Sequence, residues 1–115
     1  MTWRVEFHPD FEPEVAALAP AVRRELLAQA IVLREIGPAL GRPRVDTLKG
    51  SRIANLKELR FSTADGVWRV AFAFDGQRIA VLLAAGDKRG ISQDLFYRRL
   101  VRLAEQRFAT WRGIK

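Results

Sequence analysis

The strongest constraint on the fold is an alternation of side chains in residues 55–74, which predicts a β-hairpin. Its first strand covers residues 55–61 and its return strand residues 67–74, with a turn at Asp65–Gly66. Successive side chains of a strand point to opposite faces. The return strand therefore has one bulky apolar face, made of Trp68, Val70, Phe72 and Phe74.

The other face of the return strand carries Arg69 beside two alanines, at positions 71 and 73. An arginine with such small neighbours leaves space, so we expect this face to form the floor of a cleft. On the first strand, Leu59 and Phe61 belong to the core face. The same alternation places Glu58 and Arg60 beside Arg69. One carboxylate and two guanidinium groups would then share a shallow groove suited to phosphate chemistry.

The first part of the chain predicts one strand followed by two helices. Residues 2–7 alternate as a strand does, and residues 11–18 predict a short helix with Asp10 as its N-cap. Apolar residues at helical spacing predict a longer helix over residues 21–36, which Gly37–Pro38 ends. We expect the two helices to form a hairpin that covers one face of a sheet.

The remaining segments predict a central strand and a closing helix. Residues 37–52 are irregular, with Val45 and Leu48 as anchors, and residues 78–85 are apolar on both faces, as a central strand is. The last helix begins near Ser92, and its apolar stripe is Tyr97, Val101, Ala104, Phe108 and Trp111. The order β-α-α-β-β-β-α predicts one α+β domain over residues 1–115. Its small, twisted sheet is mostly antiparallel, with an N-terminal helical hairpin and a C-terminal helix.

The net charge of +7 lies entirely in the second half of the chain. Residues 1–50 carry seven basic and seven acidic side chains, whereas residues 51–115 carry thirteen basic and six acidic ones. This asymmetry favours a polyanionic partner, either nucleic acid or an acidic protein. An arginine-rich genome is the alternative explanation. The chain has no cysteine, no apolar run long enough to span a membrane and no signal peptide, so we expect a cytoplasmic protein.

The residue types at the expected strand ends suggest cleavage of RNA without a metal or cofactor. The single histidine, His8, excludes a two-histidine acid–base pair, and no Asp, Glu and His cluster has metal-ligand spacing. Convergent cations could instead stabilise a phosphorane when a 2′-hydroxyl attacks the adjacent phosphate. The candidates are Arg60, Arg69, Lys88 and Arg89. Glu58 would be the base, and Lys88 the acid if surrounding positive charge lowers its pKa.

The same residues also allow a structural interpretation. Glu58, Arg60 and Arg69 can form an exposed cross-strand ion pair worth about 0.2–1 kcal/mol, which composition and alternation alone favour. Strict alternation puts Lys57 on the core face, so it ranks below Glu58. Tyr97 belongs to the apolar stripe of the last helix, which favours a role in the core.

The chain resembles the RelE/ParE superfamily of type II toxins, and most closely its HigB-like, phage-derived branch. The resemblance covers roughly residues 3–108, and it rests on the order and spacing of several stretches. They are Val-Asp-Thr-Leu-Lys-Gly at 45–50, Leu-Lys-Glu-Leu-Arg at 56–60, Trp-Arg-Val-Ala-Phe at 68–72, the basic turn at 88–89 and the closing helix.

This resemblance implies an α+β toxin that cleaves messenger RNA, typically on the ribosome, without a metal. It also implies a cognate antitoxin of the HigA type, whose helix-turn-helix domain would be the only link to operator DNA. Residues matched by position are Arg69, Arg60, Lys88, Arg89 and Tyr97. Together with the alternation, they give four expected catalytic residues, Arg69, Arg60, Glu58 and Lys88. The expected RNA contacts are Arg89, Lys57, Lys49, Arg52 and Tyr97.

The chain departs from the family pattern at two places, which leaves the general base and acid open. Some members have lysines where this strand has Leu56 and Glu58, and others have a histidine near the C-terminus, where this chain has none. Two alternatives share the fold. One is a ParE-like toxin that poisons DNA gyrase, and the other is a catalytically inactive protein that only binds a partner.

Overall fold

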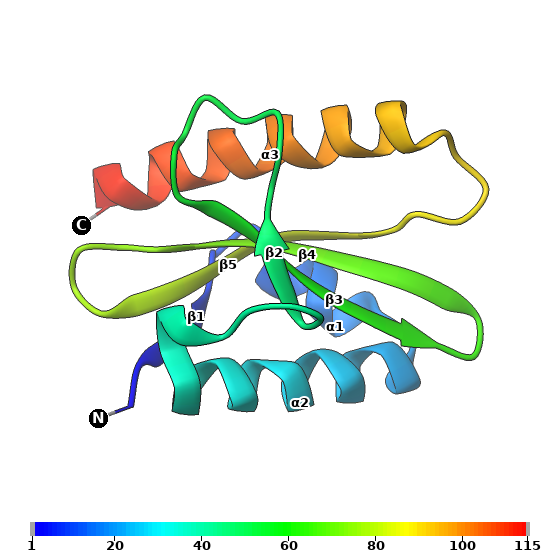
Figure 1. The fold of residues 1–115 in the computed structure, drawn as a ribbon, viewed down its shortest axis with the longest axis horizontal. Helices are drawn as coiled ribbons and strands as arrows, with labels where there is room; N and C mark the ends of the chain where they lie inside the picture. The colour runs from blue at the N-terminus through cyan, green and yellow to red at the C-terminus, as the bar shows by residue number, and fades with distance from the viewer. Residues whose placement is uncertain (1, 115) are drawn as a thin grey trace.

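The computed structural model describes residues 2–114, and it has three layers, with a sheet between two layers of helices (Figure 1). The five-stranded sheet has the order β1-β5-β4-β3-β2; β1 is parallel to β5 and the other neighbours are antiparallel. The strands are β1 Arg4–Phe7, β2 Val45–Thr47, β3 Leu56–Thr63, β4 Gly66–Phe74 and β5 Ile79–Asp87. The helices are α1 Glu12–Ala17, α2 Pro20–Ile36, the 3₁₀ turn η1 Gly37–Ala39 and α3 Gln93–Ile114.

The predicted α+β fold is confirmed, and the hairpin determines how its core divides. Leu59 pairs with Val70 and Phe61 with Trp68, so the bulky face of β3 and β4 packs against α1 and α2. The opposite face packs against α3, whose buried stripe includes Val101, Ala104, Phe108 and Trp111. Each layer of helices therefore covers its own side of the sheet.

The expectation of an open floor along β4 is wrong. Ala71 and Ala73 are completely buried, because α3 lies over them. The small side chains let the helix approach the sheet, and they do not leave a hollow. The turn of the hairpin also differs: it is formed by residues 64 and 65, and Gly66 already belongs to β4. A Cβ on Gly66 would clash with the indole ring of Trp68, so glycine lets this ring lie against the start of β4.

Two local predictions in the first half are also corrected. Residues 37–52 contain the short strand β2, which three residues of alternation are too few to reveal. Val45 and Leu48 are buried, as expected of anchors. Asp10 does not cap α1, whose N-cap is Phe11 without a side-chain hydrogen bond. The ring of His8 holds this turn instead, because its Nδ1 accepts a hydrogen bond from the Asp10 amide at 3.0 Å.

The helix ends follow the sequence more closely. Pro20 is the first residue of α2, a position that tolerates its missing N–H. Gly37 ends α2 with a φ of 69°, which favours glycine. Ser92 caps α3, since its Oγ accepts a hydrogen bond from the Leu95 amide at 3.2 Å. None of the described helices is long and apolar enough to cross a membrane.

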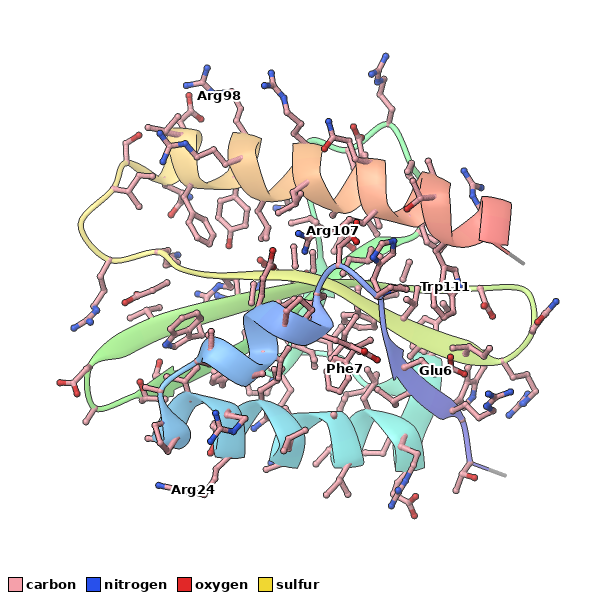
Figure 2. The ribbon with its side chains drawn as sticks, turned by 180° about the vertical axis from the view of Figure 1, so that it is seen from behind. Glu6, Phe7, Arg24, Arg98, Arg107 and Trp111 are labelled. Atoms are coloured by element: carbon pink, nitrogen blue, oxygen red, sulfur yellow. The ribbon has the colours of Figure 1, made fainter. Side chains whose placement is uncertain are left out.

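Buried polar contacts connect α3 to the first part of the chain. Arg107 of α3, labelled in Figure 2, donates to the Leu83 carbonyl of β5 at 2.8 Å and to the Glu14 carboxylate of α1 at 2.6 and 2.9 Å. His8 is also buried, and its Nε2 lies 2.8 Å from Thr110 Oγ1. These contacts fix the position of α3 against the sheet and therefore the position of Tyr97 near its start.

Candidate active site and nucleic-acid cleft

A cleft of about 610 Å³ lies between β2, β3, the segment that joins them and the first half of α3. Its lining carries more positive than negative charge. The basic residues are Arg42, Lys49, Arg52, Arg60, Arg98 and Arg102, and the acidic ones are Asp46, Glu58, Asp94 and Glu105. Of the residues predicted to share a groove, Glu58 and Arg60 line this cleft and Arg69 does not, because the cleft opens toward β2 instead of running along β4.

A cluster of three polar side chains lies at the base of this cleft. The Tyr97 hydroxyl donates a hydrogen bond to Glu58 Oε1 at 2.8 Å, and Arg69 Nε donates to the same hydroxyl at 3.3 Å. Arg69 Nε is also 3.9 Å from Glu58 Oε1. Glu58 is 6% and Arg69 7% exposed, so this is a buried pair and not the exposed ion pair that composition favoured. Tyr97 is only half-buried, and it lines the cleft.

The environment keeps the Tyr97 phenol protonated at neutral pH. Desolvation raises its pKa most, and the hydrogen bond to Glu58 raises it further, while Arg69 acts in the opposite direction. The phenol can therefore donate to Glu58 and accept from Arg69 at the same time. An hydroxyl placed between a carboxylate and a guanidinium group can pass a proton from a ligand in the cleft to the carboxylate.

Positive charge concentrates beside this cluster. Arg60 is the cross-strand partner of Arg69, and both side chains are on the face that α3 covers. Among the described residues, the Arg60 guanidinium forms one ion pair, with Asp46 at 3.8 Å, and its buried Nε has no hydrogen-bond partner. Asp46 is shared, because Arg42 donates to it at 2.9 Å. Arg60, weakly compensated and next to a second guanidinium group, is suited to bind an anion.

Lys88 approaches from the segment that follows β5. Its amide donates to the Val67 carbonyl at 2.9 Å, which fixes the backbone, and its ammonium lies 5.8 Å from the centre of the Tyr97 ring. Desolvation lowers the pKa of Lys88 most; Arg69 and Arg60 lower it further, and Glu58 opposes them. This is the direction that a general acid working near neutral pH requires.

The structure brings together most of the residues that the sequence predicted, with two exceptions. Glu58, Arg60, Lys49, Arg52 and Tyr97 line the cleft, while Arg69 and Lys88 contact Tyr97.

The exceptions are Lys57 and Arg89. Lys57 alternates with Glu58 and so belongs to the side of β3 that faces α2, away from the cleft. Arg89 is exposed and bound to Asp87 at 3.2 Å, and it does not line the cleft. Lys57 and Arg89 therefore stand apart from the residues that gather around Tyr97.

Sequence reasoning missed the contribution of α3 to the cleft wall. Arg98, Arg102 and Glu105 are spaced by four and three residues, which places them on one side of the helix. This spacing was visible in the sequence, but the adjacent apolar stripe dominated the interpretation. Arg99 is equally exposed and lies outside the lining, so it offers a matched control.

Glu105 holds the far wall of the cleft in place. Its Oε2 accepts hydrogen bonds from Ser51 Oγ and from the Arg52 amide, both at 2.8 Å. Ser51 Oγ in turn accepts from the Ile53 amide at 2.9 Å. The backbone bond from Arg52, followed by the bond from Ser51, lowers the pKa of Glu105, so it stays ionised at neutral pH. We call this arrangement the Glu105 latch. Among the described residues, no group of His, Cys, Asp and Glu side chains could hold a metal ion.

Comparison with known proteins places this site in context. Residues 13–109 match the sequence model of the family described as "Phage derived protein Gp49-like (DUF891)". Two relatives come from Mycobacterium tuberculosis. "Putative toxin HigB2" is 48% identical over 87 residues, which are 74% of this chain but only 43% of that relative. "Putative toxin HigB3" is 41% identical over 103 residues, covering 86% of this chain and 88% of the relative.

Two solved structures share the fold. A mutant of the Escherichia coli toxin RelE in its free state superposes with a TM-score of 0.56 at 13% identity, covering 89% of this chain and 96% of the other. A chain of the archaeal RelE–RelB complex from Pyrococcus horikoshii gives a TM-score of 0.56 at 20% identity, covering 78% of this chain and 99% of the other. At these identities the likeness extends to the fold alone.

Proposed function

Because the chain belongs to the phage-derived Gp49-like family and is homologous to HigB toxins, we propose that it is the toxin of a type II toxin–antitoxin system that cleaves messenger RNA. Membership confirms the resemblance seen in the sequence, and the RelE-like fold agrees with it. The observation that carries the proposed chemistry is the buried contact between Glu58, Tyr97 and Arg69 at the base of a cationic cleft.

The substrate phosphate is held by cations that are already in place. In this scheme the scissile phosphate lies among Arg60, Arg69 and Lys88, the three cations that gather near Tyr97. Negative charge increases on the phosphate oxygens as the 2′-oxygen attacks phosphorus. Fixed cations stabilise this charge without reorganisation of solvent, which commonly supplies the largest catalytic contribution.

The proton transfers use the remaining contacts. The 2′-hydroxyl gives its proton to the Tyr97 oxygen while Tyr97 gives its own proton to Glu58, across the 2.8 Å hydrogen bond. Arg69 stabilises the phenolic oxygen during this exchange. Lys88 protonates the leaving 5′-oxygen as its bond to phosphorus breaks. The products are a 2′,3′-cyclic phosphate and a free 5′-hydroxyl, with Glu58 protonated and Lys88 neutral at the end of the step.

The proposed setting is the ribosome, in the cytoplasm, where the cationic surface of α3 would face ribosomal RNA. α3 carries five arginines against two acidic residues. The proposed partner is a cognate antitoxin of the HigA type, with a helix-turn-helix domain that binds operator DNA. The complex of the archaeal RelE neighbour with RelB supports a partner of this kind.

The test is expression of the chain alone in cells, followed by mapping of new RNA 5′ ends. The wild type should arrest growth and cut translated messages. Tyr97→Phe removes only the hydroxyl, so it should keep the fold and lose the cuts, whereas Arg99→Ala should behave as the wild type. Arrest without new ends would point to a gyrase poison. Neither arrest nor cuts would leave a binding protein on a toxin fold.

A further inference from the structure

A second hollow, of about 670 Å³, lies beyond the Glu105 latch. It is formed by residues 52–55, the turn between β4 and β5, and the last part of α3. Arg52 lines both this hollow and the cleft, so the two are neighbours on the α3 side of the sheet. Figure 1 shows the segment between β2 and β3 rising beside α3 at this point.

A row of cations connects the cleft with the second hollow. On α3, Arg98, Arg102, Glu105 and Arg112 are separated by four, three and seven residues, which keeps them on one side of the helix. From Arg98 to Arg112 the helix rises about 21 Å. Glu105 interrupts the row, but its carboxylate is engaged by the latch. Within residues 2–113, neither Arg98, Arg102 nor Arg112 has an ion-pair partner.

The second hollow also offers groups that bind bases. The guanidinium group of Arg112 lies 4.9 Å from the centre of the Phe108 ring, and its side chain is exposed. A guanidinium plane supported from beneath is a surface on which a base can stack. Asn55 and Gln77 are exposed, and within the described part of the chain their side-chain amides make no hydrogen bond. Each amide can donate to and accept from a base edge.

The one carboxylate that the described residues contribute to this hollow, that of Asp75, opposes nucleic acid only weakly. Asp75 accepts hydrogen bonds from the Gln77 and Ile79 amides through Oδ1, and from Trp111 Nε1 through Oδ2. These donors compensate its charge and fix the turn between β4 and β5. The hollow therefore combines cations, an aromatic support and free amides, the features that bind single-stranded nucleic acid.

We propose that the second hollow binds a nucleotide of the same RNA strand whose scissile phosphate lies in the cleft, and that it selects the sequence near the cut. The inference rests on the proposed function. The strand follows the arginine row of α3 and passes Arg52, its base stacks on Arg112, and the amides of Asn55 and Gln77 read the base edge.

The test compares RNA of two lengths. A short 2′-O-methyl RNA of about 4 nucleotides fills the cleft alone, and one of about 12 nucleotides reaches both the cleft and the second hollow. Both lengths are within the range of known single-strand binding sites. Neither can be cleaved, because the attacking hydroxyl is blocked. Arg112→Ala should weaken binding of the long RNA about tenfold and leave the short one unchanged. Arg99→Ala, the control on the same helix, should affect both equally and slightly.

A second variant tests sequence selection without a change of charge. Asn55→Ala should redistribute the cuts in a long cleavable RNA, measured as the fraction of all cuts that falls at each position. Equal affinities of Arg112→Ala and Arg99→Ala for the long RNA would overturn the inference, as would unchanged cuts in Asn55→Ala. The inference would also be overturned if Arg112→Ala weakened binding of a poly-glutamate peptide but not of RNA, since this result would assign the hollow to an acidic protein.

The outcomes separate the inference from the proposed function. If the wild type cleaves RNA and Arg112→Ala binds the long RNA as tightly as Arg99→Ala does, the proposed function stands and only the role of the second hollow is refuted. If the wild type cleaves no RNA with or without ribosomes, the proposed function fails, and binding of the long uncleavable RNA still decides whether the hollow holds nucleic acid. Thermal unfolding of each variant confirms that a loss does not reflect misfolding.

Discussion

Arg60 lies directly opposite Arg69 across β3 and β4, so two guanidinium groups share one face of the sheet, with Arg60 lining the cleft and Arg69 buried beside it. Like charges in this position destabilise a sheet. The charge of Arg69 is compensated by the Glu58 carboxylate and by a hydrogen bond to the Tyr97 hydroxyl. Arg60 is paired only with Asp46, at 3.8 Å, and Asp46 also binds Arg42 among the described residues. The pair therefore costs the free protein stability that an anion in the cleft would restore.

Inorganic phosphate should stabilise the wild type through this pair. At ten times its Kd, phosphate stabilises by about 1.4 kcal/mol, which raises the Tm of a domain of this size by about 5 °C. Arg60→Gln should lose most of this increase, because the least compensated cation is gone. Thermal unfolding in phosphate and in chloride at equal ionic strength measures the difference. Arg99→Gln should respond as the wild type does, and an equal response of Arg60→Gln would contradict the proposed anion site.

The rate of RNA cleavage should fall at alkaline pH as Lys88 loses its proton. Its pKa is lowered from the ordinary 10.5, chiefly by desolvation and then by Arg69 and Arg60, so the decline begins at a lower pH than an ordinary lysine gives. Lys88→Arg stays protonated throughout, and we expect a rate at least about tenfold lower without this alkaline decline. The pH dependence of kcat is the measurement. An unchanged decline in Lys88→Arg would show that another group is the acid.

Folding stability should decrease as the pH falls below 6.5, because of His8. Its pKa is lowered, chiefly by desolvation; Asp10 raises it and Arg107 lowers it. Below 6.5 the unfolded chain binds a proton that the folded chain resists, so stability is full above 6.5 and is lost as the pH falls toward the lowered pKa. Denaturant unfolding at several pH values measures this slope.

The control for this prediction is His8→Gln, which does not titrate. The variant should be less stable overall, since it loses the contacts with Thr110 and the Asp10 amide. Its stability should, however, change less between pH 7 and 5 than that of the wild type. Carboxylates distant from position 8 have the same surroundings in both proteins, so their contribution cancels in the comparison. Parallel slopes would assign the acid sensitivity to those carboxylates instead.

Removal of the latch should free the segment that separates the two hollows. In Glu105→Ala the Arg52 and Ile53 amides lose the contacts that fix them, directly or through Ser51, and we expect their hydrogen exchange to become about tenfold faster. Glu105→Gln retains an acceptor oxygen for both bonds, so exchange should stay near that of the wild type. NMR-detected exchange of these amides is the measurement, with amides of β5 as the internal reference. Equal exchange in both variants would mean that packing alone holds the segment.

The hairpin was predictable because its alternation extends over many residues. The alternation predicted which side chains lie on each face of β3 and β4, and so it placed Glu58, Arg60 and Arg69 on the same face. The short strand β2 was not predictable, since three residues contain no resolved period. Helical spacing favoured a core role for Tyr97, and only the family resemblance suggested a contact with RNA. Spacing locates a ring and not the hydroxyl at its end, which here reaches Glu58.

The contacts that shape the cleft depend on tertiary structure. Glu105 and Arg52 are 53 residues apart, and no local sequence pattern predicts the hydrogen bond between them. Lys57 shows the reverse case: its charge suggested RNA binding, while its place in the alternation already indicated the other face of the sheet. Position in the strand was the better guide than residue type.

The three-layer arrangement separates charge as well as hydrophobic cores. α1 and α2 carry three arginines against four acidic residues, whereas α3 carries five arginines against two. Figure 2 shows Arg98 and Arg24 at the two opposite outer surfaces. The two helical layers therefore differ in charge, and the positive one is on the α3 side of the sheet. Near a large polyanion this difference in charge would rotate the protein so that α3 faces the polyanion before any contact forms. The fold would thus orient the protein as it approaches a polyanion. In this orientation the exposed Leu27 and Ile31 of α2 face away from the polyanion.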